Sequence, residues 1–287
     1  MPQPSGAGGL RAWLAVAGVP LLRHQLALAR ALGVQRLLCL HEADGPPLGD
    51  VEGEAALFGL RVQRAANAHA LLAQVSAADE VIVLADGLLA RAEVIVPLLE
   101  AGPAVLVQPV ETGLATGFER IDLNHAAAGA MLLPGRLVSR LADLPADVHV
   151  PSALLRVALQ AGVAQKPLPA DAAHGGGWAL LRDEAAAEQA EAAFLQLHAP
   201  DVARQPPGTR LAAWLARRFA PALLASGNNG LSMAVAGVLA LALGLVFGWL
   251  VFPALALLGL GLAAVLLGAA GVLGRMVAAG LNPGRPL

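Results

Sequence analysis

The stretch LSMAVAGVLALALGLVFGWLVFPALALLGLGLAAVLLGAAGVLG, residues 231–274, decides how the rest of the chain is organised. It contains no Asp, Glu, Lys or Arg. Because about 20 apolar residues can cross the hydrocarbon core of a bilayer, we predict two membrane helices. They cover 231–250 and 253–274, with Pro253 near the turn, and form a transmembrane hairpin within residues 230–275. The alternative is a buried hairpin of a soluble protein, but such long helices normally keep a polar face, and neither span has one.

Arginines beside this stretch predict its orientation. Arg217 and Arg218 precede the first span and Arg275 follows the second, whereas the loop between the spans carries no cation. Arg and Lys favour the cytoplasmic side of a membrane. We therefore predict a multi-pass protein of a bacterial-type inner (plasma) membrane, with its N-terminal domain in the cytoplasm. Because neither span carries an ionisable residue, a small transporter is disfavoured.

An amphipathic segment precedes the hairpin. Residues 209–224 (TRLAAWLARRFAPALL) place Leu211, Leu215 and Phe219 four positions apart, on one helical face. We predict an interfacial helix lying on the bilayer; an ordinary amphipathic helix packed on the soluble domain is the alternative. The proline-rich residues 199–208 are predicted to be a linker.

The bulk composition narrows the function. A chain of 287 residues suggests about two domains. The net charge of −2 provides no strong positive field, so we expect no nucleic-acid partner. A single cysteine, Cys39, excludes an internal disulfide framework.

Short apolar runs alternate with helical patterns over residues 5–198. The clearest strand is 80–85 (EVIVLA), and further strands are predicted at 36–40 and 104–110, with a helix at 21–32. This alternation predicts an α/β fold with a mainly parallel sheet and flanking helices. In such sheets, ligands bind beyond the carboxyl ends of the strands.

Two stretches of this domain are candidate ligand sites. The Gly-rich N-terminal segment contains Gly8, Gly9 and Arg11, whose backbone N–H groups and guanidinium could cradle phosphates; a disordered N-terminus explains the glycines equally well. Asp86 directly follows strand 80–85 and is placed to hold Mg²⁺ that bridges nucleotide phosphates. The alternative for Asp86 is a turn residue in Ala-Asp-Gly.

The N-terminal stretches together resemble a nucleotidyltransferase of the sugar-phosphate kind, which has a Rossmann-like GT-A fold. The match covers about residues 5–198. In chain order, the resemblance is carried by the Gly-rich segment with Arg11, VAGVPLL at 16–22, Ala85-Asp86-Gly87, Gly177-Trp178 and the Glu-rich helix at 183–197.

This resemblance implies substrates and site residues. The substrates would be a nucleoside triphosphate, with CTP favoured, and a small phosphorylated alcohol or sugar. Gly8, Gly9 and Arg11 would bind the phosphates, and Asp86 would hold Mg²⁺. A second metal carboxylate would come from Asp183, because Ala179-Leu-Leu-Arg182 stands where the family often has its acidic motif.

Residues 208–287 resemble the start of a CDP-alcohol phosphatidyltransferase. Gly271, Arg275 and Gly284 fall at the spacing of that family's motif, which implies nucleotide contacts for Gly271 and Arg275. Arg275 as a positive-inside anchor is the alternative. Fusions of the two modules resemble inositol-phosphate cytidylyltransferase/phosphatidyltransferase proteins, in which the first module makes a CDP-activated head group and the second joins it to an alcohol.

The chain also departs from both patterns. Ala270 stands where the membrane motif begins with Asp, the sequence to Leu287 holds no counterpart of the last two motif aspartates, and the usual lysine of the first module is missing. Two hypotheses follow. One is a membrane-anchored nucleotidyltransferase-like protein related to phospholipid head-group synthesis; the other is a non-catalytic, membrane-tethered binding or scaffold remnant. A homodimer through the membrane helices is compatible with either.

Overall fold

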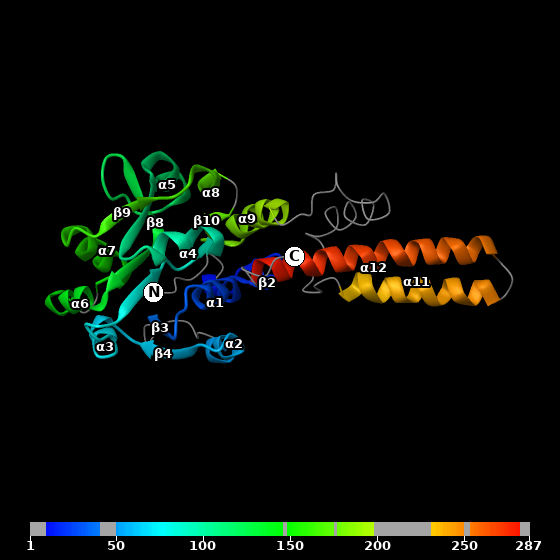
Figure 1. The fold of residues 1–287 in the computed structure, drawn as a ribbon, viewed down its shortest axis with the longest axis horizontal. Helices are drawn as coiled ribbons and strands as arrows, with labels where there is room; N and C mark the ends of the chain where they lie inside the picture. The colour runs from blue at the N-terminus through cyan, green and yellow to red at the C-terminus, as the bar shows by residue number, and fades with distance from the viewer. Residues whose placement is uncertain are drawn as a thin grey trace. The chain divides into compact units, whose positions relative to one another are not determined.

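The computed structural model describes residues 10–40, 50–145, 148–174, 177–197, 231–249 and 253–281. The chain divides into two units, one made of Met1–Leu14 with Pro20–Ala190 and the other of Ala15–Val19 with Glu191–Leu287. Figure 1 labels most of their helices and several of their strands. The predicted linker at 199–208 and the predicted interfacial helix at 209–224 lie outside the described residues.

The largest sheet of the first unit has four strands in the order β5-β8-β7-β9. The strands are β5 (Glu80–Leu84), β7 (Ala104–Pro109), β8 (His125–Pro134) and β9 (Ala164–Pro167). β8 runs antiparallel to both of its neighbours, whereas β7 and β9 are parallel. The sheet is therefore mixed, and the predicted Rossmann-like, mainly parallel sheet is not confirmed. An apolar run predicts a buried strand but carries no information about its direction.

Three two-stranded sheets complete the strands of the described part of the chain. β3 pairs in parallel with β4, β6 pairs with β10 in antiparallel orientation, and β1 pairs with β2. Their bounds are β1 Ala15–Val16, β2 Val19–Pro20, β3 Arg36–Leu40, β4 Arg61–Ala65, β6 Leu88–Ala90 and β10 Trp178–Leu180. The strands predicted at 36–40, 80–85 and 104–110 are confirmed to within one residue.

Helices connect these strands, so the α/β class is confirmed. The α-helices before residue 198 are α1 Leu21–Ala31, α2 Val51–Leu57, α3 Ala68–Leu72, α4 Ala92–Glu100, α5 Val110–Thr116, α6 Gly135–Val138, α7 Val150–Gln160, α8 Ala170–His174 and α9 Glu184–Leu197. Two 3₁₀ helices cover Arg11–Trp13 and Ser139–Asp143. The predicted helix at 21–32 is confirmed as α1. Gly33 follows it with a φ of 72°, a left-handed conformation that favours glycine after a helix.

The two central strands of the four-stranded sheet, β8 and β7, are buried on both faces. Side chains alternate across a strand, so Val105 of β7 joins a cluster with Leu154 of α7, whereas Leu106 joins a second cluster with Ile95 of α4. Trp178 belongs to the second cluster, and its Nε1–H donates to the carbonyl oxygen of Ala128 at 2.8 Å. These two strands are thereby held between helices, and the turn at the carboxyl end of β5 and the adjoining loops remain to form a site.

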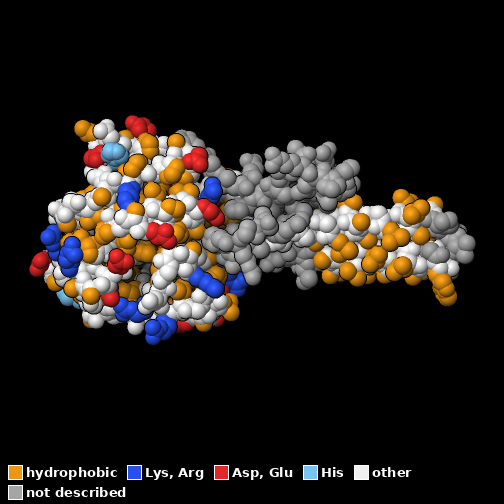
Figure 2. Space-filling model, in the orientation of Figure 1, with side chains coloured by type: hydrophobic (Ala, Val, Ile, Leu, Met, Phe, Trp, Pro, Cys, Tyr) orange, Lys and Arg blue, Asp and Glu red, His pale blue; other side chains and the backbone are white. Residues whose placement is uncertain are grey.

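The second unit contains two apolar helices, α11 (Leu231–Trp249) and α12 (Pro253–Leu281). They approach closely at small residues: a Cβ atom added to Gly259 would lie 2.7 Å from the Cα atom of Gly244. Ala256 and Ala263 are buried in the same contact, whereas large side chains such as Leu257 face outward. Figure 2 shows hydrophobic side chains covering the visible face of these helices.

One helix segment, Ala254–Gly271, is long and apolar enough to cross a membrane, judged by length and composition. The apolar segment of α11, Ala234–Phe247, is shorter. A single candidate span among the described residues is weak support for a membrane location, and the predicted multi-pass topology is not supported. α12 also continues past the predicted end at residue 274, because nothing in GRMVAAGL at 274–281 breaks a helix.

Candidate functional site

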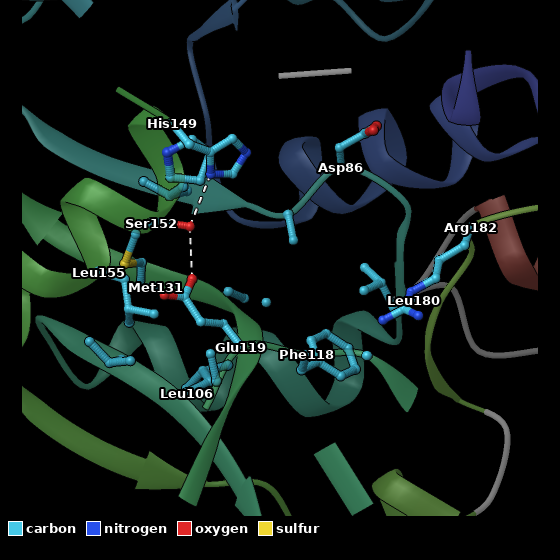
Figure 3. A pocket seen from close by; sticks show the side chains of 18 of the residues that line it. Asp86, Leu106, Phe118, Glu119, Met131, His149, Ser152, Leu155, Leu180 and Arg182 are labelled. Atoms are coloured by element: carbon cyan, nitrogen blue, oxygen red, sulfur yellow. Dashed lines mark hydrogen bonds between the residues drawn. The ribbon is translucent and has the colours of Figure 1, made fainter. Parts of the chain in front are cut away.

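A cavity of about 410 Å³ opens beside the carboxyl end of β5 in the first unit. Its size is in the range of small-molecule sites. Its walls come from β5, β7 and β8, from the loop after α5, from the first turns of α7 and from the segment after β10. The apolar part of the lining includes Leu106, Phe118 and Met131, and charged groups stand around it (Figure 3).

Arg11 and Asp86 lie together on the cavity wall. A guanidinium nitrogen of Arg11 is 3.9 Å from Oδ2 of Asp86, and both side chains are only 16% exposed. Asp86 is carried by the turn after β5, where the next residue, Gly87, has a φ of 87°. The structure thus brings Asp86 and Arg11 together, whereas Gly8 and Gly9 lie outside the described residues.

The same turn brings a second arginine to the cavity. The backbone N–H of Leu181 donates to the carbonyl oxygen of Gly87 at 2.8 Å, which ties the segment after β10 to the turn after β5. Arg182 follows, and its guanidinium occupies the space where a side chain at Gly117 would stand. Gly117 ends α5 with a φ of 86°. Glycine at position 87 therefore allows the turn after β5, and glycine at position 117 leaves the space that the Arg182 guanidinium occupies.

A chain of hydrogen bonds forms another part of the wall. Nδ1 of His149 is 2.9 Å from Oγ of Ser152, and Oγ of Ser152 is 2.7 Å from Oε2 of Glu119. The serine hydroxyl has one proton, which it donates to the Glu119 carboxylate; Nδ1 of His149 therefore carries the proton that it donates to the serine. Burial lowers the pKa of His149, against the opposing effect of the Glu119 charge. The neutral imidazole consequently keeps Nε2 as a hydrogen-bond acceptor.

Local sequence places these three groups. Pro151 lies in the first turn of α7, a position that suits its fixed φ and its missing N–H, so Ser152 and the preceding His149 stand at the start of that helix. Glu119 is held from the other side, because its carbonyl oxygen accepts from the backbone N–H of Ala127 in β8 at 2.7 Å. In Figure 3 the three hydrogen-bonded side chains lie toward the left and centre of the view, whereas Asp86 and Arg182 lie toward the right.

Three further predicted site residues lie in the described part of the chain: Asp183, Gly271 and Arg275. Asp183 is not among the lining residues in the described part of the chain; its Oδ1 accepts from the backbone N–H of Ala186 at 2.8 Å and caps the start of α9. Gly271 and Arg275 belong to α12, in the other unit. A carboxylate at a helix start can be a capping group as readily as a metal ligand, and the contact that the structure gives for Asp183 is the capping one.

The donor set does not match a protein-built Mg²⁺ site. Mg²⁺ prefers near-octahedral oxygen ligands and is usually held by one or two carboxylates together with substrate phosphates. Asp86 has Arg11 beside it, and Asp183 caps a helix. Within the residues that the structure describes, no group of three or more His, Cys, Asp or Glu side chains could hold a metal.

Four residues of the cavity were not predicted as functional: Glu119, Ser152, His149 and Arg182. They belong to separate segments, and no motif spacing joins them; Glu119 and Ser152 are 33 positions apart. For Arg182 the sequence offers one signal: it lies in Ala179-Leu-Leu-Arg182, which stands where the resembled family often has its acidic motif. A cation in place of a carboxylate favours direct binding of an anion.

Comparison with the models of known protein families finds no match, and comparison with curated proteins finds none either.

Proposed function

We propose that this protein is a membrane-anchored, nucleotidyltransferase-like protein that binds a nucleotide and a small phosphorylated alcohol or sugar, with its transfer chemistry degenerate. CTP is the favoured nucleotide, and CDP-activated head-group synthesis is the related pathway class. The observation that carries the proposal is the convergence of Arg11, Asp86 and Arg182 on one cavity at the carboxyl end of β5. Arginine matches phosphate oxygens in charge and geometry.

The state of the carboxylates supports the degenerate reading. Asp86 stands 3.9 Å from Arg11, and Asp183 is used as a helix cap. In this proposal the positive charge for phosphate binding comes from the arginines, and no step passes through a metal. For Arg182 no carboxylate partner occurs in the described ranges, so its charge is available to a ligand.

An active transferase is the second candidate, and the same two arginines favour it because they would offset charge on a transferring phosphoryl group. An oxygen of the substrate phosphate would attack the α-phosphorus of CTP. A new P–O bond would form, the bond to the β-phosphate oxygen would break, and pyrophosphate would leave.

One experiment separates the two candidates. The purified full chain in detergent is titrated with each nucleoside triphosphate by calorimetry, and pyrophosphate is assayed after adding glucose 1-phosphate or myo-inositol 1-phosphate. We expect saturable CTP binding without pyrophosphate release. Steady release would establish the transferase, and absence of binding by every nucleotide would overturn the proposal.

Substitution of Asp86 distinguishes phosphate binding by the arginines from phosphate binding through a metal ion. We expect Asp86→Asn to keep or tighten CTP binding, since it removes a negative charge from a phosphate site, and we expect chelation of divalent metals to change the affinity by less than about twofold. If Asp86→Asn or chelation abolished binding, a metal-bridged phosphate would be established instead.

The membrane anchor rests on the apolar helices. We propose that α12 and the shorter α11 form a two-helix hairpin whose ends face the cytoplasm. Fusion of green fluorescent protein to Leu287 should then fluoresce, and fusion of alkaline phosphatase at the same residue should be inactive. The opposite pattern would exclude this orientation.

A further inference from the structure

The cavity lies where strand β8 bulges away from β7. Val105 of β7 pairs with Met131 of β8. Two positions further along β7, Val107 pairs with Ala127, which is four positions away from Met131. Gly129, inside the longer stretch, has a left-handed φ of 80°. A bulge of this kind disrupts the hydrogen-bonded ladder locally, and the cavity lies over the disruption, since Val105, Gly129 and Met131 all line it.

The deep part of the cavity is apolar. Its floor consists of six side chains that are each at most 8% exposed: Leu106, Phe118, Ala127, Ala130, Met131 and Leu155. They come from both hydrophobic clusters of the first unit. In contrast, Glu119, His149 and Arg182 are exposed. Polar groups therefore surround the opening of the cavity, and the apolar floor receives whatever part of a ligand goes deepest.

The backbone beneath the floor offers little to a polar ligand. The carbonyl oxygens of three consecutive bulge residues, 127–129, already accept hydrogen bonds within the protein. Their donors are the side chains of Gln108, at 3.1 Å, and Trp178, at 2.8 Å, and the backbone N–H of Ala85, at 2.7 Å. A ligand hydroxyl on the floor would lose its hydrogen bonds to water without replacing them, whereas an apolar group would gain from leaving water.

A cation stands beside this floor. The guanidinium of Arg182 occupies the space next to Gly117, and the following residue is Phe118. A Cβ atom added to Gly129 would lie 2.8 Å from Cε1 of Phe118, so the ring reaches the bulge. In Figure 3, Phe118 lies between Arg182 and Leu106. An anionic group bound by Arg182 is therefore followed directly by the apolar floor.

We infer that the non-nucleotide ligand is the phosphate ester of a short, single-chain apolar alcohol. Its phosphate is held by Arg182 and Arg11, and its alkyl chain fills the apolar floor. A cavity of about 410 Å³ is near the lower end of the range of small-molecule sites, so it takes one short chain and no two-chain phospholipid. This inference rests on the proposed function for the phosphate end, whereas the alkyl end stands on the bulge and the buried floor.

The test measures how affinity depends on chain length. The full chain in lipid nanodiscs is titrated by calorimetry with methyl, butyl and hexyl phosphate and with CTP, and empty nanodiscs are the blank. Each buried CH₂ group adds a factor of about four in affinity. We therefore expect hexyl phosphate to bind about a hundredfold or more tightly than methyl phosphate, with butyl phosphate between them. Dihexanoyl phosphatidic acid, a two-chain phosphate, should gain nothing over methyl phosphate.

Two variants fill the floor independently. Ala127→Leu extends into it from one hydrophobic cluster and Ala130→Leu from the other. Each should lower the ratio of the hexyl to the methyl phosphate affinity about tenfold or more. Ala115→Leu, the same change at an exposed residue of α5 that is not among the lining residues, should keep the ratio. Thermal unfolding followed by circular dichroism checks that the variants are folded.

Arg182→Gln should show the opposite signature. It removes the cation and leaves the floor, so all three alkyl phosphates should weaken alike and the ratio should be kept. A ratio that also survives Ala127→Leu and Ala130→Leu would show that the alkyl chain lies elsewhere and would overturn the inference.

The remaining outcomes separate this inference from the proposed function. If CTP binds and the three alkyl phosphates bind alike, the inference is wrong and the proposed function stands; weakening of CTP by Ala127→Leu would then assign the floor to the cytosine base. If affinity rises with chain length and no nucleotide binds, the inference stands and the proposed function fails. Tight binding of dihexanoyl phosphatidic acid would point to a membrane lipid and overturn the single-chain class. If no probe binds, both are rejected.

Discussion

The apolar helix pair α11–α12 and the cavity of the first unit depend on the sequence in different ways. Large outward side chains of the pair, such as Leu257 and Leu258, are 71% and 70% exposed. Many other apolar residues could replace them without changing the chemistry of the surface. The cavity instead depends on a few polar side chains from separate segments. Composition therefore determines the first region, and long-range contacts determine the second. Substitutions should act differently in the two regions.

The largest effect is expected at Gly87. Its φ of 87° and its closeness to the carbonyl oxygen of Leu181 leave no room for a side chain. We expect Gly87→Ala to lower the free energy of unfolding by about 3 kcal/mol or more, from backbone strain and overpacking together, and to abolish ligand binding. Denaturant unfolding of the full chain measures it.

Gly102→Ala is the matched control for this change. Gly102 has a φ of 105°, but an added Cβ would have no atom within 4 Å. Backbone strain alone should therefore lower its free energy of unfolding, and the loss should be smaller than for Gly87→Ala. Equal losses in the two variants would show that the contact between Gly87 and Leu181 is unimportant.

A smaller effect is expected in the helix pair. Gly259→Ala places a methyl group against the backbone of Gly244 and should reduce helix-pair stability by about 1–3 kcal/mol, measured by unfolding in micelles. Gly261→Ala, where an added Cβ meets nothing within 4 Å, should have little effect. Ligand affinity should not change in either variant. A loss of affinity in Gly259→Ala would contradict the independence of the two regions.

Removing one cavity charge should change affinity more than stability. We expect Arg182→Gln to weaken the binding of CTP and of methyl phosphate about tenfold or more, because the substitution removes charge-assisted hydrogen bonds to phosphate. Arg156→Gln removes an exposed arginine of α7 outside the cavity and serves as the control. Equal weakening by both substitutions would indicate a general charge effect and no specific site.

The smallest effect is a pH dependence at His149. Because burial lowers its pKa in the folded state, the unfolded chain binds its proton more readily. Folding stability should therefore fall as the pH drops from the unfolded pKa of about 6.5 through the lower folded value. His149→Gln should abolish this stability change, and denaturant unfolding between pH 7.5 and pH 5 measures it. An equal loss of stability in the variant would show that another group is responsible.

Much of the local structure follows from local sequence. The strands predicted at 36–40 and 80–85 and the helix predicted at 21–32 are confirmed, because hydrophobic periodicity and terminal glycines act over a few residues. The direction of β8 could not be predicted in the same way. It is decided by the pairing of β8 with β5 on one side and β7 on the other, which connects residues up to 54 positions apart, as in the pair Glu80 and Pro134.

The sequence by itself determined several of the helices and strands, the apolar C-terminal helices, and the place of Asp86 directly after strand β5, because each depends on neighbouring residues. Only the tertiary structure decided that Arg182 joins Arg11 at the cavity, that Asp183 caps a helix, and that Glu119, Ser152 and His149 form one hydrogen-bonded wall. These features depend on contacts between distant segments, and the free energy of such contacts is set by the whole fold.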